Sequence, residues 1–220
     1  MTVSADTSPP RIALVAGALG SAADAASLGR ALANGFAQRG WDVALQRSPD
    51  APRAAADALV ASCAAVLGRP ACVVFVSACA STDDAHTADA ASLAGALARN
   101  VTAPLALARA LADATPDTAR DDESLRACAI HVLDQALFHP APAQLSHALM
   151  QAALNRATSA LALALAPKVR VAALVRGHAP HVNDIAAAAC YLASAPGVTG
   201  ATLTVDGGEH LVPPAAGPND

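Results

Sequence analysis

Three glycines, Gly17, Gly20 and Gly29, lie where an apolar segment gives way to a helix-forming one. The segment RIALVAG is predicted to be a buried first strand, and a helix is expected over about 27–39. A glycine-containing turn between a strand and a helix lets backbone N–H groups at the helix N-terminus face a phosphate. The pattern therefore favours a nucleotide-binding turn. The alternative is a strand-to-helix turn that holds no ligand.

Other reactive residue types form no recognisable site. Five histidines make no helix-spaced pair with a carboxylate: His131, His139, His178, His181 and His210. His178 and His181 are close enough in sequence to share a metal ion, but an exposed loop is the preferred interpretation. The chain has no GxSxG motif and no Walker loop. We therefore predict no metal site and no serine nucleophile.

Length and composition indicate a single domain. The chain has 220 residues, 54% of them hydrophobic and 2% aromatic, so its core is built mainly from Ala, Val and Leu. We expect one domain over 11–211, a disordered start over 1–10 and a frayed, proline-rich tail over 212–220.

Charge and cysteine usage restrict the partners and the compartment. The net charge is −4 and Lys168 is the single lysine, which argues against nucleic acid. The apolar run 12–19 is too short to cross a bilayer, and the first residues lack the basic start of a secretory signal. Five cysteines without CxxC spacing suggest reduced, buried thiols. A cytoplasmic protein without a membrane partner is expected.

The stretch 127–177 predicts how the chain is built. A short apolar strand over 129–133 ends in Asp134, a long apolar helix follows over about 143–166, and a second strand spans 169–175. Strand, helix and strand in this order are typical of a parallel sheet, because parallel neighbours need a crossover. The helix is apolar on nearly every side, so we expect the sheet to cover one face and a second subunit to cover another.

Several motifs in this order resemble the short-chain dehydrogenase/reductases. The run 130–177 contains "LDQ", "LALALAPKVRV" and a closing "RG", the segment "ARNVTAPLALARAL" carries Asn100, and the chain later reads "VDGG" at 205–208. An Asp at position 134 is most similar to the pteridine reductase branch, which includes dihydropteridine and dihydromonapterin reductases. The resemblance extends over about 11–211.

The resemblance implies four catalytic positions. Asn100 matches the family's helix asparagine, and Asp134 stands where most members carry Ser. The family's Tyr and Lys fall on His147, thirteen residues after Asp134, and on Gln151. Imidazole titrates near neutral pH, so His147 is a candidate proton donor, and Gln151 is a candidate donor to a ribose hydroxyl. The alternative is that His147 and Gln151 are polar residues buried in a helix.

The same resemblance implies an NADP site. Gly17, Gly20 and Gly29 correspond to the glycine fingerprint, with a longer loop before Gly29, and Ser77 replaces an amide that lines the cofactor. Arg47 and Ser48 stand where pteridine reductases hold the 2′-phosphate, a role that suits a guanidinium. A surface arginine in a turn is the alternative, and residues 42–48 correspond either to the second or to the third family strand.

The implied fold is α/β, a Rossmann-like doubly wound parallel sheet in three α/β/α layers. It is shortened by one β-α unit, and the substrate lid is missing because few residues separate 177 from the helix expected after Asn183. The implied function is a divergent NADP-linked oxidoreductase acting on a pterin-like substrate. The alternative is an inactive homologue that binds or assembles with a partner. Homo-oligomers, or hetero-oligomers with an active paralogue, are expected through the 144–166 helix.

Overall fold

The computed structural model describes residues 11–17, 23–47, 53–79, 82–178 and 181–212. Gly20, Ser48, the predicted disordered start and the predicted tail beyond Val212 lie outside the described residues.

A single sheet of parallel strands forms the centre of the described chain. Its strands are β1 (Arg11–Gly17), β2 (Trp41–Arg47), β3 (Cys72–Val76), β4 (Ala127–Asp134), β5 (Val169–Arg176) and β6 (Thr202–Val205), in the order β2-β1-β3-β4-β5-β6. Each neighbouring pair is parallel. The predicted doubly wound parallel sheet is therefore confirmed.

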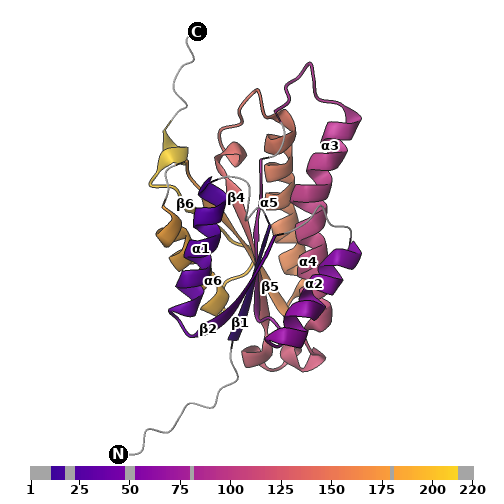
Figure 1. Cartoon of the computed structure of the whole chain (residues 1–220), viewed down its shortest axis with the longest axis vertical. Helices are drawn as coiled ribbons and strands as arrows, with labels where there is room; N and C mark the ends of the chain where they lie inside the picture. The colour runs from indigo at the N-terminus through magenta and orange to yellow at the C-terminus, as the bar shows by residue number, and fades with distance from the viewer. Residues whose placement is uncertain (1–10, 18–22, 48–52, 80–81, 179–180, 213–220) are drawn as a thin grey trace, which may run out of the picture.

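Helices cover both faces of this sheet, which gives three layers (Figure 1). On one face lie α1 (Ala23–Ala37) and α6 (Val182–Ser194), and on the other lie α2 (Arg53–Val66), α4 (Ala103–Ala114) and α5 (Leu145–Leu165). The chain passes from α1 on one face to α2 on the opposite face, so its direction along the sheet reverses between β1 and β3. In such sheets ligands bind beyond the carboxyl ends of the strands at this point.

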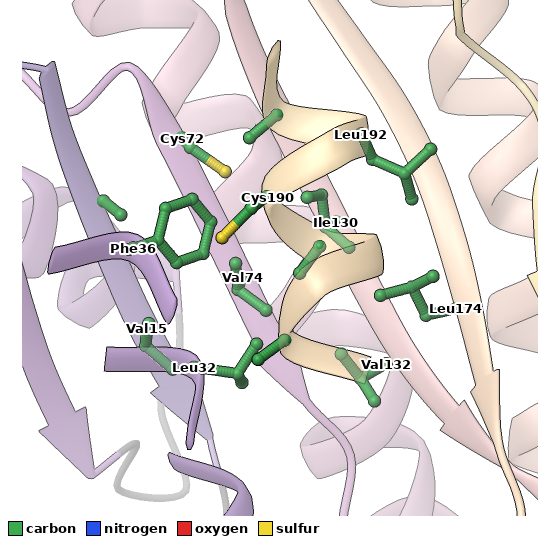
Figure 2. Packing of buried hydrophobic residues seen from close by; sticks show 14 of the residues in the cluster. Val15, Leu32, Phe36, Cys72, Val74, Ile130, Val132, Leu174, Cys190 and Leu192 are labelled. Atoms are coloured by element: carbon green, nitrogen blue, oxygen red, sulfur yellow. The ribbon is translucent and has the colours of Figure 1, made fainter. Parts of the chain in front are cut away.

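The core on the α1 and α6 side combines large and small side chains. Leu32 and Phe36 of α1 and Leu192 of α6 pack against strand residues such as Val74 and Ile130 (Figure 2). Burying each of these large side chains stabilises the fold by roughly 1.5–3 kcal/mol.

Small residues let α1 and α6 approach closely, since a Cβ at Gly35 would lie only 3.1 Å from the Ala186 Cβ. This packing explains how a chain with few aromatic residues still fills its core.

The helical segment 90–114 is interrupted. It consists of α3 (Ala90–Leu97), a π-helical turn η1 (Ala98–Thr102) and α4. Asn100 lies in the π turn and is 3% exposed. Single π turns are rare insertions that often occur at functional sites, so the interruption draws attention to Asn100.

One local prediction needs correction. The last helix was expected to begin after Asn183, but α6 begins at Val182 and His181 occupies the N-cap position, so Asn183 lies inside the first turn.

The charged segment 115–126 is mostly exposed. It contains two short turns, η2 (Asp117–Arg120) and η3 (Glu123–Leu125), and Ala119 of η2 is buried.

The predicted shortening is visible in the strand order. Only β2 lies between α1 and α2, and it pairs directly with β1. The second strand of the doubly wound order 3-2-1-4-5-6 occupies this place, so residues 42–48 correspond to the second family strand and not to the third. Only five residues separate Arg176 of β5 from Val182 of α6, which leaves little chain for a lid. Among the described residues no helix is long and apolar enough to cross a membrane.

Candidate active site at the carboxyl edge of the sheet

The predicted site residues converge where the central strands end. Gly17 is the last residue of β1, Ser77 follows the last residue of β3, and Asp134 is the last residue of β4. Helix α5 returns over this edge and brings His147 and Gln151 to it, and the π turn contributes Asn100. Residues far apart in the sequence are thus gathered at the edge where α/β proteins hold ligands.

Asp134 and His147 form a hydrogen-bonded dyad. The Asp134 Oδ2 and the His147 Nε2 are 2.8 Å apart, and the Asp134 Oδ1 accepts a bond from the Ala136 N–H at 3.0 Å. Burial favours a raised pKa for Asp134, but the bonds from His147 and Ala136 outweigh it, so the pKa of this carboxyl lies below its usual value. Because the carboxylate only accepts bonds, the network assigns the hydrogen of His147 to Nε2.

The two side chains of the dyad differ in their exposure to solvent. The side chain of His147 is 2% exposed, whereas that of Asp134 is 20% exposed. The buried His147 Nδ1 has no hydrogen-bond partner among the described residues. The carboxylate is therefore the member of the dyad that solvent or a ligand can reach, and the imidazole lies buried next to it.

Gln151 ties the ends of two strands together. Its Oε1 accepts a bond from the Asp134 N–H at 3.2 Å, and its Nε2 donates to the Ser77 Oγ at 3.1 Å. The Ser77 hydroxyl in turn donates to the Val132 carbonyl at 2.8 Å. Gln151 is 0% exposed and Ser77 is 4% exposed. Both side chains are thus engaged inside the protein, which leaves their predicted roles beside a cofactor as predictions.

Asn100 fixes the loop that follows β3. Its Oδ1 accepts a bond from the Ala78 N–H at 3.1 Å. Ala78 directly follows Ser77, so Asn100 and Gln151 hold adjacent residues of the same strand end. The π turn presents Asn100 to this loop, which gives the interruption of the helix a structural role.

The start of α5 is anchored by a carboxylate that sequence reasoning did not select. Asp83 is 6% exposed; its Oδ1 accepts a bond from the Ser146 N–H at 2.9 Å, and its Oδ2 accepts one from the Ser146 hydroxyl. These bonds hold the pKa of Asp83 below its usual value. Because Ser146 directly precedes His147, Asp83 sets where His147 lies. Its only sequence signal was its place in a polar loop.

The single tyrosine and the single lysine of the chain lie away from this edge. Tyr191 is 59% exposed on α6. Lys168 pairs with Asp117 at 3.0 Å. Neither residue type is therefore available beside Asp134.

The predicted cofactor residues that the structure describes lie at or near the carboxyl edge between β1 and β3. Gly17 has a φ of +119°, and a Cβ there would lie 2.2 Å from the Val76 carbonyl oxygen, so only glycine suits this crowded strand end. Arg47 is the register partner of Gly17, and its backbone therefore lies beside the same strand end. Gly29 is buried in the second turn of α1. Together with Ser77 these residues remain predicted contacts of a dinucleotide.

A second acidic group supports the turn after Asp134. Asp206 accepts a bond from the Gln135 Nε2 at 2.7 Å, and from the His210 and Gly208 N–H groups at 2.8 and 2.9 Å. Burial opposes ionisation here, yet these donors lower the pKa of Asp206 to about 2. Its bond to Gln135 joins the turn after β4 to the residue that follows β6. No group of three His, Cys, Asp or Glu residues within the described part of the chain is arranged to hold a metal ion.

Comparisons with known proteins agree with this architecture. A family model described as "Short chain dehydrogenase-like protein" matches residues 104–205. No curated protein matches the sequence.

Three solved structures illustrate the likeness. A 3-ketoacyl-(acyl-carrier-protein) reductase from Brucella melitensis, complexed with NADH, has a TM-score of 0.77 at 22% identity, with 91% of this chain and 98% of that chain covered. The FolM alternative dihydrofolate reductase 1 from Brucella canis, complexed with NADP, has a TM-score of 0.73 at 21% identity, with 92% and 95% covered. A short-chain dehydrogenase/reductase from Serratia marcescens has a TM-score of 0.69 at 22% identity, with 90% and 96% covered.

The likeness covers nearly the whole of each protein, so this chain and these structures share one fold. The resemblance indicated by the sequence motifs is thus confirmed by an independent family model and by the three-dimensional architecture. The chain has the Rossmann-like fold of the short-chain dehydrogenase/reductases, and residues 104–205 match a family model of that group.

Proposed function

We propose that this protein is a divergent NADP-linked oxidoreductase of short-chain dehydrogenase/reductase type that acts on a pterin-like substrate. The observation that carries the proposal is the Asp134–His147 dyad, held at 2.8 Å at the carboxyl end of a central strand with its carboxylate partly exposed. A structural neighbour named as an alternative dihydrofolate reductase, complexed with NADP, supports both the substrate class and the cofactor.

In the proposed reaction a hydride and a proton reach the substrate at the strand end. Water that reaches the partly exposed Asp134 donates the proton to the substrate atom, the resulting hydroxide is neutralised by bulk solvent, and the carboxylate orients the water and the substrate. The His147 Nε2–H fixes this carboxylate through its bond to the Asp134 Oδ2. His147 therefore acts through Asp134, because its ring is buried.

A bound NADP(H) would supply the hydride. Backbone N–H groups near the strand end at Gly17 and the start of α1 are the proposed contacts of its phosphates, and Arg47 is the candidate residue to bind the 2′-phosphate. Asn100, Ser77 and Gln151 shape the wall beside Asp134 by tying the ends of β3 and β4. This arrangement keeps the dyad in place without the tyrosine and lysine of the family.

The first test is a calorimetric titration with NADPH and, separately, NADH, followed by a screen of NADPH oxidation with dihydropterins and quinones. Micromolar binding of NADPH with weaker binding of NADH is expected, because only NADPH carries the phosphate that Arg47 is proposed to hold. If neither nucleotide binds, the oxidoreductase proposal fails.

A variant of the dyad tests the role of His147. His147→Ala is expected to abolish turnover while leaving the affinity for NADPH nearly unchanged, because His147 lies behind Asp134 and not beside the dinucleotide edge. His86→Ala, in an exposed turn far along the chain from α5, is the matched control and should retain activity. Equal activity of His147→Ala and the unmodified protein would remove His147 from the mechanism.

A second candidate function is that of an inactive homologue that assembles with a partner through α5. The observation that favours it is the burial of both replaced positions, His147 at 2% and Gln151 at 0%, together with exposed leucines on the outer face of α5. In this case NADPH oxidation is absent with every substrate, and the outer face of α5 carries the function.

A further inference from the structure

Arg176 lies beside Asp134 at the same edge of the sheet. Asp134 ends β4 and Arg176 ends β5, and the two are direct register partners in parallel strands. Paired residues of neighbouring strands project to the same side of a sheet. The nearby guanidinium is one of the influences that lower the pKa of the Asp134 carboxyl, after burial and the bonds from His147 and Ala136.

The guanidinium of Arg176 has no hydrogen bond or ion pair with any other described group, although it is half-buried. Two further carboxylates lie near the adjacent Gly177, but each has its own donors. Asp206 is bound by Gln135 and His210, and Glu209 is bound by His178. Arg176 is therefore an available cation next to a partly exposed carboxylate.

We infer that Asp134 and Arg176 form a two-point recognition site for a ligand that carries both a pair of N–H donors and an anionic group. Asp134 accepts the N–H donors, because an ionised carboxylate only accepts. Arg176 binds the anion, because a guanidinium offers paired donors to carboxylate or phosphate. This inference rests on the proposed function, since it names which pterin-like molecules the site prefers: those with an acidic side chain.

The short β5–α6 connection gives the two opposite charges at this edge a role in orienting a ligand. The short connection between β5 and α6 leaves few residues to cover a substrate, so its orientation depends on contacts at the strand ends. Two charges of opposite sign on adjacent strands orient a ligand that has a donor edge at one end and an anion at the other.

The experiment measures binding by calorimetry, without nucleotide, of dihydroneopterin, its monophosphate ester and dihydrofolate. The first has an uncharged side chain, and the other two carry a phosphate or carboxylates. At least one anionic pterin is expected to bind about tenfold more tightly than dihydroneopterin, and the preferred one identifies the anion. Equal affinities, or no binding of any of the three, would overturn the inference.

Variants assign the effect to the two residues. Arg176→Gln should remove the preference for the anionic pterin, and Arg176→Lys should retain part of it. Asp134→Asn should weaken all three by a similar factor. Arg120→Gln, at an exposed position of the short turn η2, is the control and should behave as the unmodified protein. A preference that persists in Arg176→Gln contradicts the role of Arg176.

Because this titration uses neither NADPH nor turnover, it separates the two proposals. Selective binding of an acidic pterin in a protein that does not bind NADPH would support the recognition site and reject the oxidoreductase. Binding of NADPH without selectivity among the pterins would support the oxidoreductase and reject the recognition site.

Discussion

His131 of β4 and His147 of α5 are both buried, but their ring nitrogens bond to different kinds of partner. His147 is bonded to Asp134, an ionised partner, whereas the His131 Nδ1 is bonded to the neutral Thr158 hydroxyl at 2.9 Å. That hydroxyl donates its own hydrogen to the Leu154 carbonyl, so the network places the hydrogen of His131 on Nδ1. His131 is 1% exposed, and its Nε2 has no partner within the described structure. A second proton on this ring would be a buried, unpaired charge.

His131 therefore makes the fold sensitive to mild acid. Burial lowers its pKa to about 4 from 6.5, so between these values the unfolded chain binds a proton that the folded chain does not. The stability contributed by neutral His131 is fully present above pH 6.5 and is lost as the pH falls toward 4, by about 3 kcal/mol in all. Urea unfolding at intervals across this range measures the loss. His131→Leu should show a much flatter dependence over the same interval, and an equally steep one would contradict the assignment.

Single residues were identified unevenly from the sequence. Asp134, His147, Gln151 and Asn100 were selected by spacing relative to a family pattern, and the structure brings all four to one edge. The burial of His147 and Gln151 agrees with the alternative that they are polar residues buried in a helix. A helix of Ala and Leu on nearly every side did not reveal which of its faces meets the sheet. Asp83 and Arg176 were missed, since a carboxylate in a polar loop and an arginine at a strand end are common features. Only strand register makes Arg176 a neighbour of Asp134.

Among the helices and strands, α6 depends on a buried cation at its C-terminal end. Arg170 of β5 is 8% exposed and donates to the carbonyls of Leu192, Ala193 and Val198 at 2.8–3.0 Å. These carbonyls lie at and just beyond the end of the helix, where backbone acceptors lack intrahelical partners and a positive charge is favoured. The arginine thus joins α6 to the sheet that it covers.

Arg170→Met should destabilise the protein by about 3 kcal/mol, because it leaves three acceptors in a buried region without their donor. Chemical denaturation followed by circular dichroism measures the change in the free energy of unfolding. Arg156→Met, at an exposed position of α5, is the control, with an expected change within about 0.5 kcal/mol. Similar losses for both variants would mean that the three bonds add nothing specific.

The order and type of the helices and strands followed from the sequence better than their ends and irregularities. Apolar runs bounded by glycine or proline marked β1, β3 and β5, since buried parallel strands are continuous in hydrophobicity. The π turn at Asn100 gave no signal, because it depends on the contact with Ala78 and not on local preference. The N-cap of α6 was misplaced by two residues, since Asn183 has the chemistry of a cap but the chain turns earlier.

For the molecule as a whole, the family resemblance implied the doubly wound parallel sheet and the missing unit between α1 and α2, whereas the place of residues 42–48 in the sheet was left open. The outer side of α5 is exposed in the single chain. Leu149 and Leu163 on this side are 47% and 84% exposed, and Ala152 lies between them on the exposed side. A helix with one stripe against its own sheet and a second apolar stripe facing outward is suited to pairing with another subunit.

We predict that Ala152→Glu shifts the protein toward monomer, because it places a charge in the apolar contact that a second copy of the chain would make with α5. Sedimentation velocity of the full chain measures the mass at several concentrations. Ala187→Glu introduces the same charge at an exposed position of α6, in the opposite layer, and should leave the mass unchanged. If both variants and the unmodified protein sediment with the same mass, α5 does not form the interface. If only Ala187→Glu dissociates, the subunits pair through the α1 and α6 layer instead, and the apolar outer face of α5 needs another explanation.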